Sequence, residues 1–252
     1  MMPSRFLKII YSKYYRCLFF ADIKRRVFKP RTFTNLGITI GIDYELFTND
    51  IINHMLAGYY ETDELFIINR ILSPDDIVLE IGAGIGFTSS YIAKKLSPKG
   101  SIECFEANST LIPLIKENHK RNGVVVGVQN AILSKGEGFT KFYISGGFWG
   151  SSTQGFWGDS TEQADGKTIY VPNVDFQEYL DEYRSTMLVI DIEGGETDLF
   201  SEVDLKNVKK ICMEIHPQMT GWEPIDKMMS NLIAQGFKMD ENSDSNVRAF
   251  LR

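Results

Sequence analysis

The sequence predicts an α/β fold with a doubly wound, mostly parallel, Rossmann-like sheet. From residue 77 onward, short apolar runs typical of buried strands alternate with segments of helical periodicity. The first run, Ile77 to Ile81, leads into glycines at every second position, Gly82, Gly84 and Gly86, and a helical pattern follows at once. Alternating strands and helices form right-handed parallel βαβ units. The sequence is therefore expected to place a side-chain-free turn at the end of a buried strand.

Each element is predicted from a local pattern, and proline or glycine marks several of the element ends. An amphipathic helix through Leu65 and Ile71 stops before Pro74, because the residue before a proline disfavours helical geometry. Glycine follows two later helical segments at Gly123 and Gly236, as is common at helix C-termini. Apolar runs predict strands at 77–81, 101–106, 124–128, 187–191, 208–215, 237–239 and 247–251, and helical periodicity predicts helices at 86–96, 109–122 and 226–235.

Residues 134–183 are an insertion between the third and fourth strands. The insertion contains strand-like runs at 139–144 and 168–174, and a glycine-rich loop with two Phe-Trp pairs lies between them: Phe148-Trp149 and Phe156-Trp157. Aromatic faces on such a loop are suited to stacking on a sugar ring and closing over it as an acceptor-binding lid. The alternative is that these aromatic side chains anchor the loop to the core, and both interpretations stay open.

Charge is distributed unevenly along the chain, and this limits the classes of partner. Residues 1–31 carry nine Lys or Arg and one acid, whereas the remainder carries 18 bases and 32 acids. The excess of acids after residue 31 argues against a nucleic-acid substrate, because nucleic acids are polyanions. Two of the three cysteines, Cys104 and Cys212, sit in apolar runs, which favours reduced core thiols and a cytoplasmic location. The basic start of the chain is not followed by a signal-peptide pattern, so export is not expected.

The basic start of the chain forms a distinct segment, predicted at residues 1–35, ahead of the catalytic domain predicted at 36–252. Apolar residues recur at helical spacing between Phe6 and Phe19, and basic residues fill the positions between them. An amphipathic helix of this kind over residues 5–31 suits peripheral contact with the inner, anionic face of a membrane. Packing on the domain or on a second subunit is the alternative. The apolar runs are too short to span a bilayer.

The glycine turn and the acid before it predict a cradle for a cationic ligand. A dinucleotide fingerprint has its third glycine three positions after the second, but Phe87 stands there and the glycine is at Gly86. Glu80 would repel a pyrophosphate and would attract an ammonium group. A phosphate-binding loop is excluded because no Gly-Lys-Ser/Thr follows. A nicotinamide-dependent oxidoreductase and a non-catalytic, membrane-associated scaffold remain as alternative functions.

Two further strand ends carry side chains suited to binding a nucleoside. Glu106 ends the second strand, 26 positions after Glu80, where its carboxylate can accept hydrogen bonds from both hydroxyls of a ribose. Asn130 and Ala131 follow the third strand and are placed to hold an adenine edge, although a plain turn would also explain them.

The fourth and fifth strands end in acids and an imidazole, and these are the candidate catalytic residues. Strand periodicity puts Asp191 with Glu193, and Glu214 with His216, on one face each. Ligands of open α/β sheets bind at these carboxyl ends. A reaction at a hydroxyl oxygen requires loss of its proton, and His216 or Asp191 is the expected base. Glu193 and Glu214 could instead be structural hydrogen-bond acceptors.

Two other interpretations concern the same strand ends. Glu196 is expected to complement a helix dipole. A magnesium or manganese ion is an alternative ligand for the carboxylates and the imidazole, but no established metal-ligand spacing is present, and we therefore expect no metal.

These motifs together resemble the FkbM family of methyltransferases. The resemblance spans residues 58–217, and its most distinctive segment runs from Asp191 to Glu196, with Tyr60-Glu61 similar to an upstream element. It implies a class I fold with seven strands, the last antiparallel, and S-adenosylmethionine as the methyl donor. It also implies methylation of a hydroxyl oxygen, often of a sugar in a glycolipid, surface polysaccharide or secondary metabolite. The donor residues implied are Glu80, Gly82, Ala83, Gly84, Gly86, Thr88, Glu106, Ala107, Asn130 and Ala131, and the catalytic residues are Asp191, Glu193 and His216.

Overall fold

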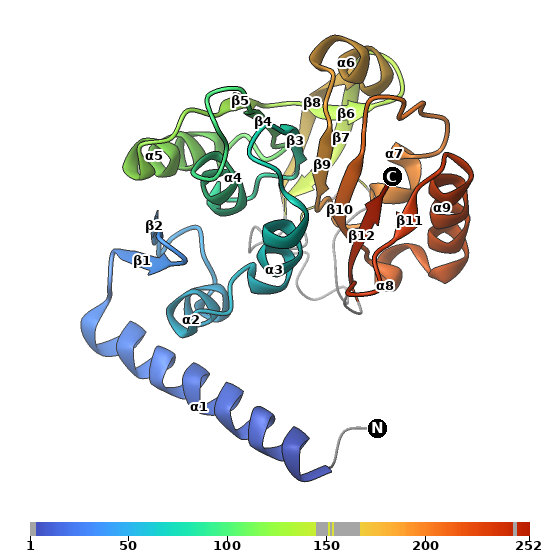
Figure 1. The fold of residues 1–252 in the computed structure, drawn as a ribbon. Coiled ribbons are helices and arrows are strands. Elements are labelled where there is room, and N and C mark those ends of the chain that lie inside the picture. Colours follow the sequence, from blue (N-terminus) through green and yellow to red (C-terminus); the bar gives the residue numbers. More distant parts are fainter. Residues whose placement is uncertain (1–3, 145–150, 152, 154–166, 244–245) are drawn as a thin grey trace. The chain divides into compact units, whose positions relative to one another are not determined.

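The computed structural model describes residues 4–144, 151, 153, 167–243 and 246–252, which form two compact units (Figure 1). The first unit comprises residues 1–62 and the second comprises residues 63–252. The boundary predicted at residue 35 separates a basic segment from a catalytic domain. A division into compact units does not test that boundary, which therefore stays a prediction. The two Phe-Trp pairs, from Phe148 to Trp157, lie outside the described residues. Within the described part of the chain, no helix is long and apolar enough to cross a membrane.

The first unit consists of two helices and a hairpin. Helix α1 (Ser4–Phe28) is followed by strands β1 (Thr32–Asn35) and β2 (Ile38–Gly41), which pair in antiparallel fashion, and by helix α2 (Asn49–Ala57). Polar contacts join the two helices: the Tyr14 hydroxyl lies 2.9 Å from His54 Nε2, and Arg25 Nε donates to Asn53 Oδ1 at 3.0 Å. His54 is thus part of the packing between α1 and α2.

The second unit is built on a seven-stranded sheet with the order β11-β12-β10-β9-β3-β4-β5. Strand β12 is antiparallel to both of its neighbours, and the other strands of this sheet pair in parallel. This confirms the predicted class I fold with its antiparallel last strand. The strands are β3 (Ile77–Ile81), β4 (Ser101–Phe105), β5 (Gly127–Gln129), β9 (Met187–Ile190), β10 (Lys210–Glu214), β11 (Lys238–Met239) and β12 (Val247–Leu251).

Helices cover both faces of this sheet, as Figure 1 shows. On one side, α4 (Phe87–Ala93) and α5 (Ile112–Asn122) contact each other and strands β4 and β5. On the other side, α6 (Phe176–Tyr183), α7 (Glu196–Leu199) and α9 (Trp222–Ala234) contribute apolar side chains to one core cluster with the strands. Alternate strand residues such as Leu79 and Ile81 enter this cluster because successive side chains point to opposite faces. The second unit also contains helices α3 (Thr62–Ile71) and α8 (Pro217–Thr220).

The insertion forms a second, three-stranded sheet of β6 (Ile132–Ser134), β8 (Lys167–Asp175) and β7 (Gly138–Ile144), in that order. The two strand-like runs predicted there are confirmed. Helix α6, at the end of the insertion, was not predicted. Asp175 caps α6 by accepting the backbone N–H of Glu178 at 2.9 Å, and it also accepts that of Gly136 at 2.8 Å.

The predicted start of the third strand was wrong, and the end of α5 explains why. Gly123 closes α5 in left-handed geometry, and the Val124 N–H donates to the His119 carbonyl at 3.1 Å. This turn uses the first residues of the apolar run, and Val125 is 95% exposed. Strand β5 therefore begins at Gly127. An apolar run alone does not distinguish a strand from the turn that leads into it.

The centre of the sheet is the point where the strand order reverses, between β3 and β9. The Asp191 N–H donates to the Ile81 carbonyl at 3.0 Å, which extends the pairing of β3 with β9 by one residue. Gly82 follows with φ +90°, and a Cβ on this residue would lie 1.8 Å from the Asp191 carbonyl oxygen. The backbones of the two strand ends are in direct contact, and only glycine fits at residue 82.

Replacing Gly82 by alanine should destabilise the fold strongly. The change combines left-handed strain with a backbone clash, and we expect a loss of about 3 kcal/mol in the free energy of unfolding, measured by urea denaturation. Gly123→Ala is the matched control, because Gly123 has φ +65° but open space around the added Cβ. The control should lose about 1 kcal/mol. Equal losses in the two variants would contradict the role given to the contact with Asp191.

Candidate active site

The glycine turn after β3 packs closely on the elements around it. The N–H groups of Gly82 and Ala83 both donate to the Phe105 carbonyl, at 2.9 and 3.1 Å, and this bond pair fixes the turn against the end of β4. A Cβ on Gly86, which has φ +77°, would lie 3.1 Å from His119 Nε2. His119 is buried, bonds to Ser89 at 2.9 Å, and has a pKa lowered to about 4 by burial. It is a neutral packing residue behind the turn.

Glu106, which follows β4, is hydrogen-bonded to the glycine turn. One carboxylate oxygen accepts the N–H of Gly84 at 2.9 Å, and the other accepts the N–H of Asn108 at 2.7 Å. The side chain is buried, and burial raises its pKa to about 7 although these N–H groups oppose the shift. Each carboxylate oxygen has a second lone pair that can accept a further hydrogen bond. Glu106 is thus oriented and still able to accept ligand hydroxyls.

Glu80 lies deeper, inside the sheet. It is 2% exposed, and its partners in register are Cys104 on β4 and Val189 on β9. Burial raises the pKa of Cys104, and the charges of Glu80 and Glu106 add to this shift. The carboxylates of Glu80 and Glu106 therefore both lie near the end of β4. The glycine turn stands between these two residues in the sequence.

The remaining donor candidates divide into two groups. The Asn130 amide donates to the carbonyls of Glu106 at 2.8 Å and Ala107 at 3.1 Å, so these three residues stand together at the strand ends. Thr88 is different, because its hydroxyl donates to Glu64 on α3 at 3.2 Å. Ala131 belongs to the apolar core. The Thr88 side chain is thus hydrogen-bonded to α3, and the Ala131 side chain packs in the core.

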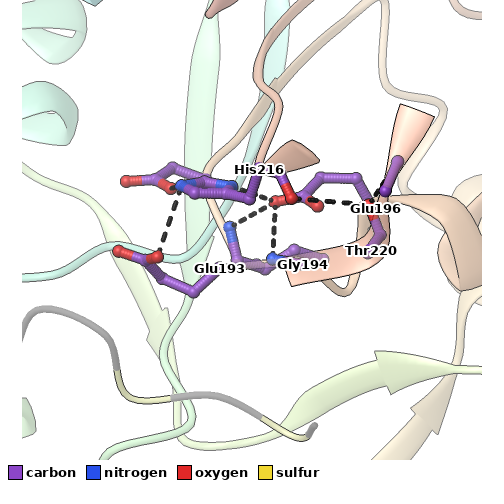
Figure 2. Close-up of polar contacts among 8 residues, drawn as sticks. Glu193, Gly194, Glu196, His216 and Thr220 are labelled. Carbon is purple, nitrogen blue, oxygen red and sulfur yellow. Dashed lines mark hydrogen bonds and ion pairs between the residues drawn. The ribbon is translucent and has the colours of Figure 1, made fainter. Parts of the chain in front are cut away.

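The acids and the imidazole at the ends of β9 and β10 come together as predicted. His216 Nε2 lies 3.3 Å from Glu193 Oε2 and 3.6 Å from Asp191 Oδ1. The His216 side chain is 5% exposed, whereas those of Asp191 and Glu193 are 29% and 24% exposed. Figure 2 shows His216 between Glu193 and Glu196. Because Gly82 touches Asp191, this cluster adjoins the glycine turn.

Glu196 is the member of the cluster that sequence reasoning missed. It begins α7, where a helix-dipole role was expected, but its carboxylate is 2% exposed and lies 2.9 Å from His216 Nδ1. The same oxygen accepts the N–H groups of Gly194 at 3.2 Å and Ile192 at 3.4 Å. The signal was present in the sequence, since Glu196 closes the most distinctive segment of the family resemblance.

The cluster holds an excess of negative charge around one imidazole. Burial alone would lower the pKa of His216, but the Glu196 hydrogen bond and the charges of Asp191 and Glu193 outweigh it and raise the pKa to about 9. Burial and the neighbouring Glu193 and Glu196 raise the pKa of Glu214 despite the opposing effect of His216. In the absence of another cation, His216 therefore carries a proton at neutral pH and is a poor proton acceptor.

The chain matches one protein family, and it resembles solved structures at low identity. Residues 80–239, more than half of the chain, match the methyltransferase FkbM domain. A precorrin-6y C5,15-methyltransferase from Geobacter metallireducens is 16% identical with a TM-score of 0.46, covering 84% of this chain and 97% of that one. A Bacillus cereus O-methyltransferase in complex with SAH is 12% identical with a TM-score of 0.44, covering 75% and 78%.

A third solved structure contains the expected donor. Aeropyrum pernix fibrillarin with natively bound S-adenosyl-L-methionine is 11% identical with a TM-score of 0.40, covering 74% of this chain and 71% of that one. No curated protein matches the chain significantly. The family match identifies an enzyme that transfers a methyl group rather than the nicotinamide-dependent oxidoreductase or the non-catalytic scaffold. With its class I sheet and its FkbM domain, the chain belongs to the FkbM family of S-adenosylmethionine-dependent methyltransferases.

Proposed function

We propose that the protein is an O-methyltransferase whose acceptor is a hydroxyl of a sugar in a glycolipid, a surface polysaccharide or a secondary metabolite. The observation that carries this proposal is the cluster of Asp191, Glu193 and His216 beside the glycine turn. A neutral hydroxyl must lose its proton in or before the transition state of methyl transfer. Carboxylates and an imidazole next to the donor site are suited to promoting that loss.

On the donor side, the acids and the glycine turn have complementary roles. Glu106 is oriented by the N–H groups of Gly84 and Asn108, and we infer that it accepts hydrogen bonds from the ribose hydroxyls of the donor. Ala107 and Asn130 adjoin it, at the place where an adenine would follow. Glu80 supplies negative charge at the carboxyl end of β3, which favours the ammonium and sulfonium groups. The glycines leave room for the ligand to approach the backbone.

On the acceptor side, alignment and proton loss are separate contributions. Holding the hydroxyl in line with the sulfonium methyl group supplies much of the rate enhancement of such a displacement. We infer that Asp191, Glu193 and His216 face the acceptor and promote the loss of its proton. Of the two bases expected from the sequence, His216 is disfavoured in the cation-free cluster because it already holds a proton there. Glu196 positions the His216 ring.

A surface of α1 supports a lipid-linked acceptor. Tyr15, Phe19, Ile23 and Val27 are exposed and follow one another at intervals of four residues, which places them along one side of the helix. Exposed bases flank them: Lys13, Arg16, Lys24 and Arg26. We propose that this apolar and basic surface binds the anionic, cytoplasmic face of a membrane, where a glycolipid acceptor would be presented. Association of two chains through the same side of α1 is the competing explanation.

Loss of the Glu106 carboxylate should abolish tight donor binding. In Glu106→Ala the ribose hydroxyls lose a charged acceptor and the N–H of Gly84 loses its partner, so the affinity for S-adenosylmethionine should fall at least ~30-fold, equivalent to about 2 kcal/mol. Isothermal titration calorimetry measures this directly. Glu117→Gln, which alters an exposed acid on α5, is the control and should bind like the unmodified protein. Unchanged affinity in Glu106→Ala would contradict the ribose role.

Methyl transfer itself can be tested with labelled donor and extracted glycolipids, polysaccharides and secondary metabolites as acceptors. The product should keep its label after mild alkali, because a methyl ether survives conditions that hydrolyse a methyl ester. His216→Asn should lower turnover by at least ~100-fold while its affinity for S-adenosylmethionine, measured by calorimetry, stays within about twofold. An alkali-labile product would contradict O-methylation of a hydroxyl. Full turnover in the variant would remove His216 from the reaction.

Vesicle sedimentation tests the membrane surface of α1. The protein should sediment with vesicles that contain phosphatidylserine or phosphatidylglycerol and not with pure phosphatidylcholine. Replacing Lys13 and Lys24 together by Gln should weaken binding ~30-fold at low salt, since each base near an anionic surface contributes about 1 kcal/mol. Phe19→Ser should also weaken it, whereas Phe139→Ser, at an exposed aromatic residue of β7, should not. Dimers in light scattering without vesicle binding would favour association between chains instead.

A further inference from the structure

The protonation of His216 can be deduced from its contacts. Its Nδ1 lies 2.9 Å from Glu196 Oε1, and the same oxygen accepts the N–H groups of Gly194 and Ile192. An oxygen that accepts two backbone N–H groups is a carboxylate acceptor, so the imidazole donates from Nδ1. Donation from Nδ1 leaves Nε2 of a neutral ring with a lone pair. That lone pair points away from Glu196.

Nε2 faces two further acceptors. Glu193 Oε2 and Asp191 Oδ1 lie 3.3 and 3.6 Å from it. A lone pair opposite two carboxylate oxygens is repulsive unless a positive charge lies between them. Burial of the His216 side chain, which is 5% exposed, strengthens that repulsion by excluding water. The cluster therefore requires a cation at this point, either a proton or a metal ion.

The structure assigns a divalent cation to this point: we propose that Asp191, Glu193 and His216 Nε2 bind a magnesium- or manganese-class ion. One ligand atom from each residue lies within 4.8 Å of the other two. Ligands about 2.1 Å from a common ion and at right angles to one another are about 3 Å apart, so the distances of 3.3 and 3.6 Å from Nε2 need only a small contraction. Two carboxylates and one imidazole suit these metals.

Glu196 has a defined part in this site. Histidine ligands of metals are commonly oriented by a carboxylate on the other ring nitrogen, and such a partner also makes the ligating nitrogen more basic. The Glu196 contact with Nδ1 has this arrangement, and the N–H groups of Gly194 and Ile192 hold the carboxylate in place. Glu196 is thus a positioning residue, and the ion itself would contact only the other three side chains.

The inferred ion would act on the acceptor, and this part of the inference rests on the proposed function. Because Asp191 touches Gly82, an ion at the cluster adjoins the donor turn. An acceptor hydroxyl oxygen bound to it would have a lowered pKa. In the reaction the O–H bond breaks and its proton passes to water, the oxygen forms a bond to the methyl carbon, and the S–CH3 bond breaks. The products are a methyl ether and S-adenosylhomocysteine.

Titration of the full-length, chelator-treated protein with MnCl2 alone tests the site. Calorimetry and the electron paramagnetic resonance signal of free Mn2+ should show one ion bound per chain. Asp191→Asn and Glu193→Gln should each weaken binding at least tenfold, whereas Asp198→Asn, at an exposed acid on α7, should not. Bound Mn2+ should also broaden the imidazole resonances of His216 beyond detection.

Two results would overturn the cation site. One is the absence of saturable Mn2+ binding up to millimolar concentrations, which would assign the positive charge to a proton on Nε2. The other is binding that survives both substitutions. Calorimetry with S-adenosylmethionine on the same samples shows whether each variant is folded and competent for the donor. Mn2+ binding at His216 without transfer to any hydroxyl acceptor would count against the proposed function and leave the cation site standing.

Discussion

The active-site architecture depends on the contact between Gly82 and Asp191. The space that a Cβ at residue 82 would occupy is taken by the Asp191 carbonyl, so the ends of β3 and β9 lie backbone against backbone. The glycine turn that follows β3 and the acidic segment that follows β9 start from this point. A donor held by the turn and an acceptor held by the acids are thereby brought to adjoining positions without a flexible element between them. The strand order reverses here, which is where open α/β sheets bind ligands.

Buried carboxylates form the second constraint, because each needs compensation for the loss of water. Glu106 obtains it from the N–H groups of Gly84 and Asn108, and Glu196 obtains it from the N–H of Gly194 and the His216 ring. In both cases the compensating groups belong to the loop that follows a strand. The hydrogen bonds that offset the desolvation of each buried carboxylate therefore also fix the conformation of its loop. The site is thus ordered before any ligand binds.

The sequence predicted most of the fold because periodicity and glycine placement are local properties. Strand β3, its turn and helix α5 followed from residues within a few positions of one another. The start of β5 was not predicted correctly, because Val124 belongs to the turn after α5. Valine has a high strand propensity, so propensity alone assigns this residue to the strand. Glu196 was missed for a different reason. Its partner His216 is 20 positions away, and pairing across the sheet cannot be read from spacing along the chain.

Charge explains why a cation at the acidic cluster would matter for methyl transfer. The sulfonium of the donor is positive in the ground state and becomes a neutral sulfide, so the transition state carries less charge at sulfur. The negative charge of Asp191 and Glu193 would therefore stabilise the bound donor more than the transition state, and differential stabilisation of this sign slows the reaction. A divalent ion held by these acids would remove that penalty. It would also stabilise the developing alkoxide, and the same acids would then favour the transition state by holding the ion.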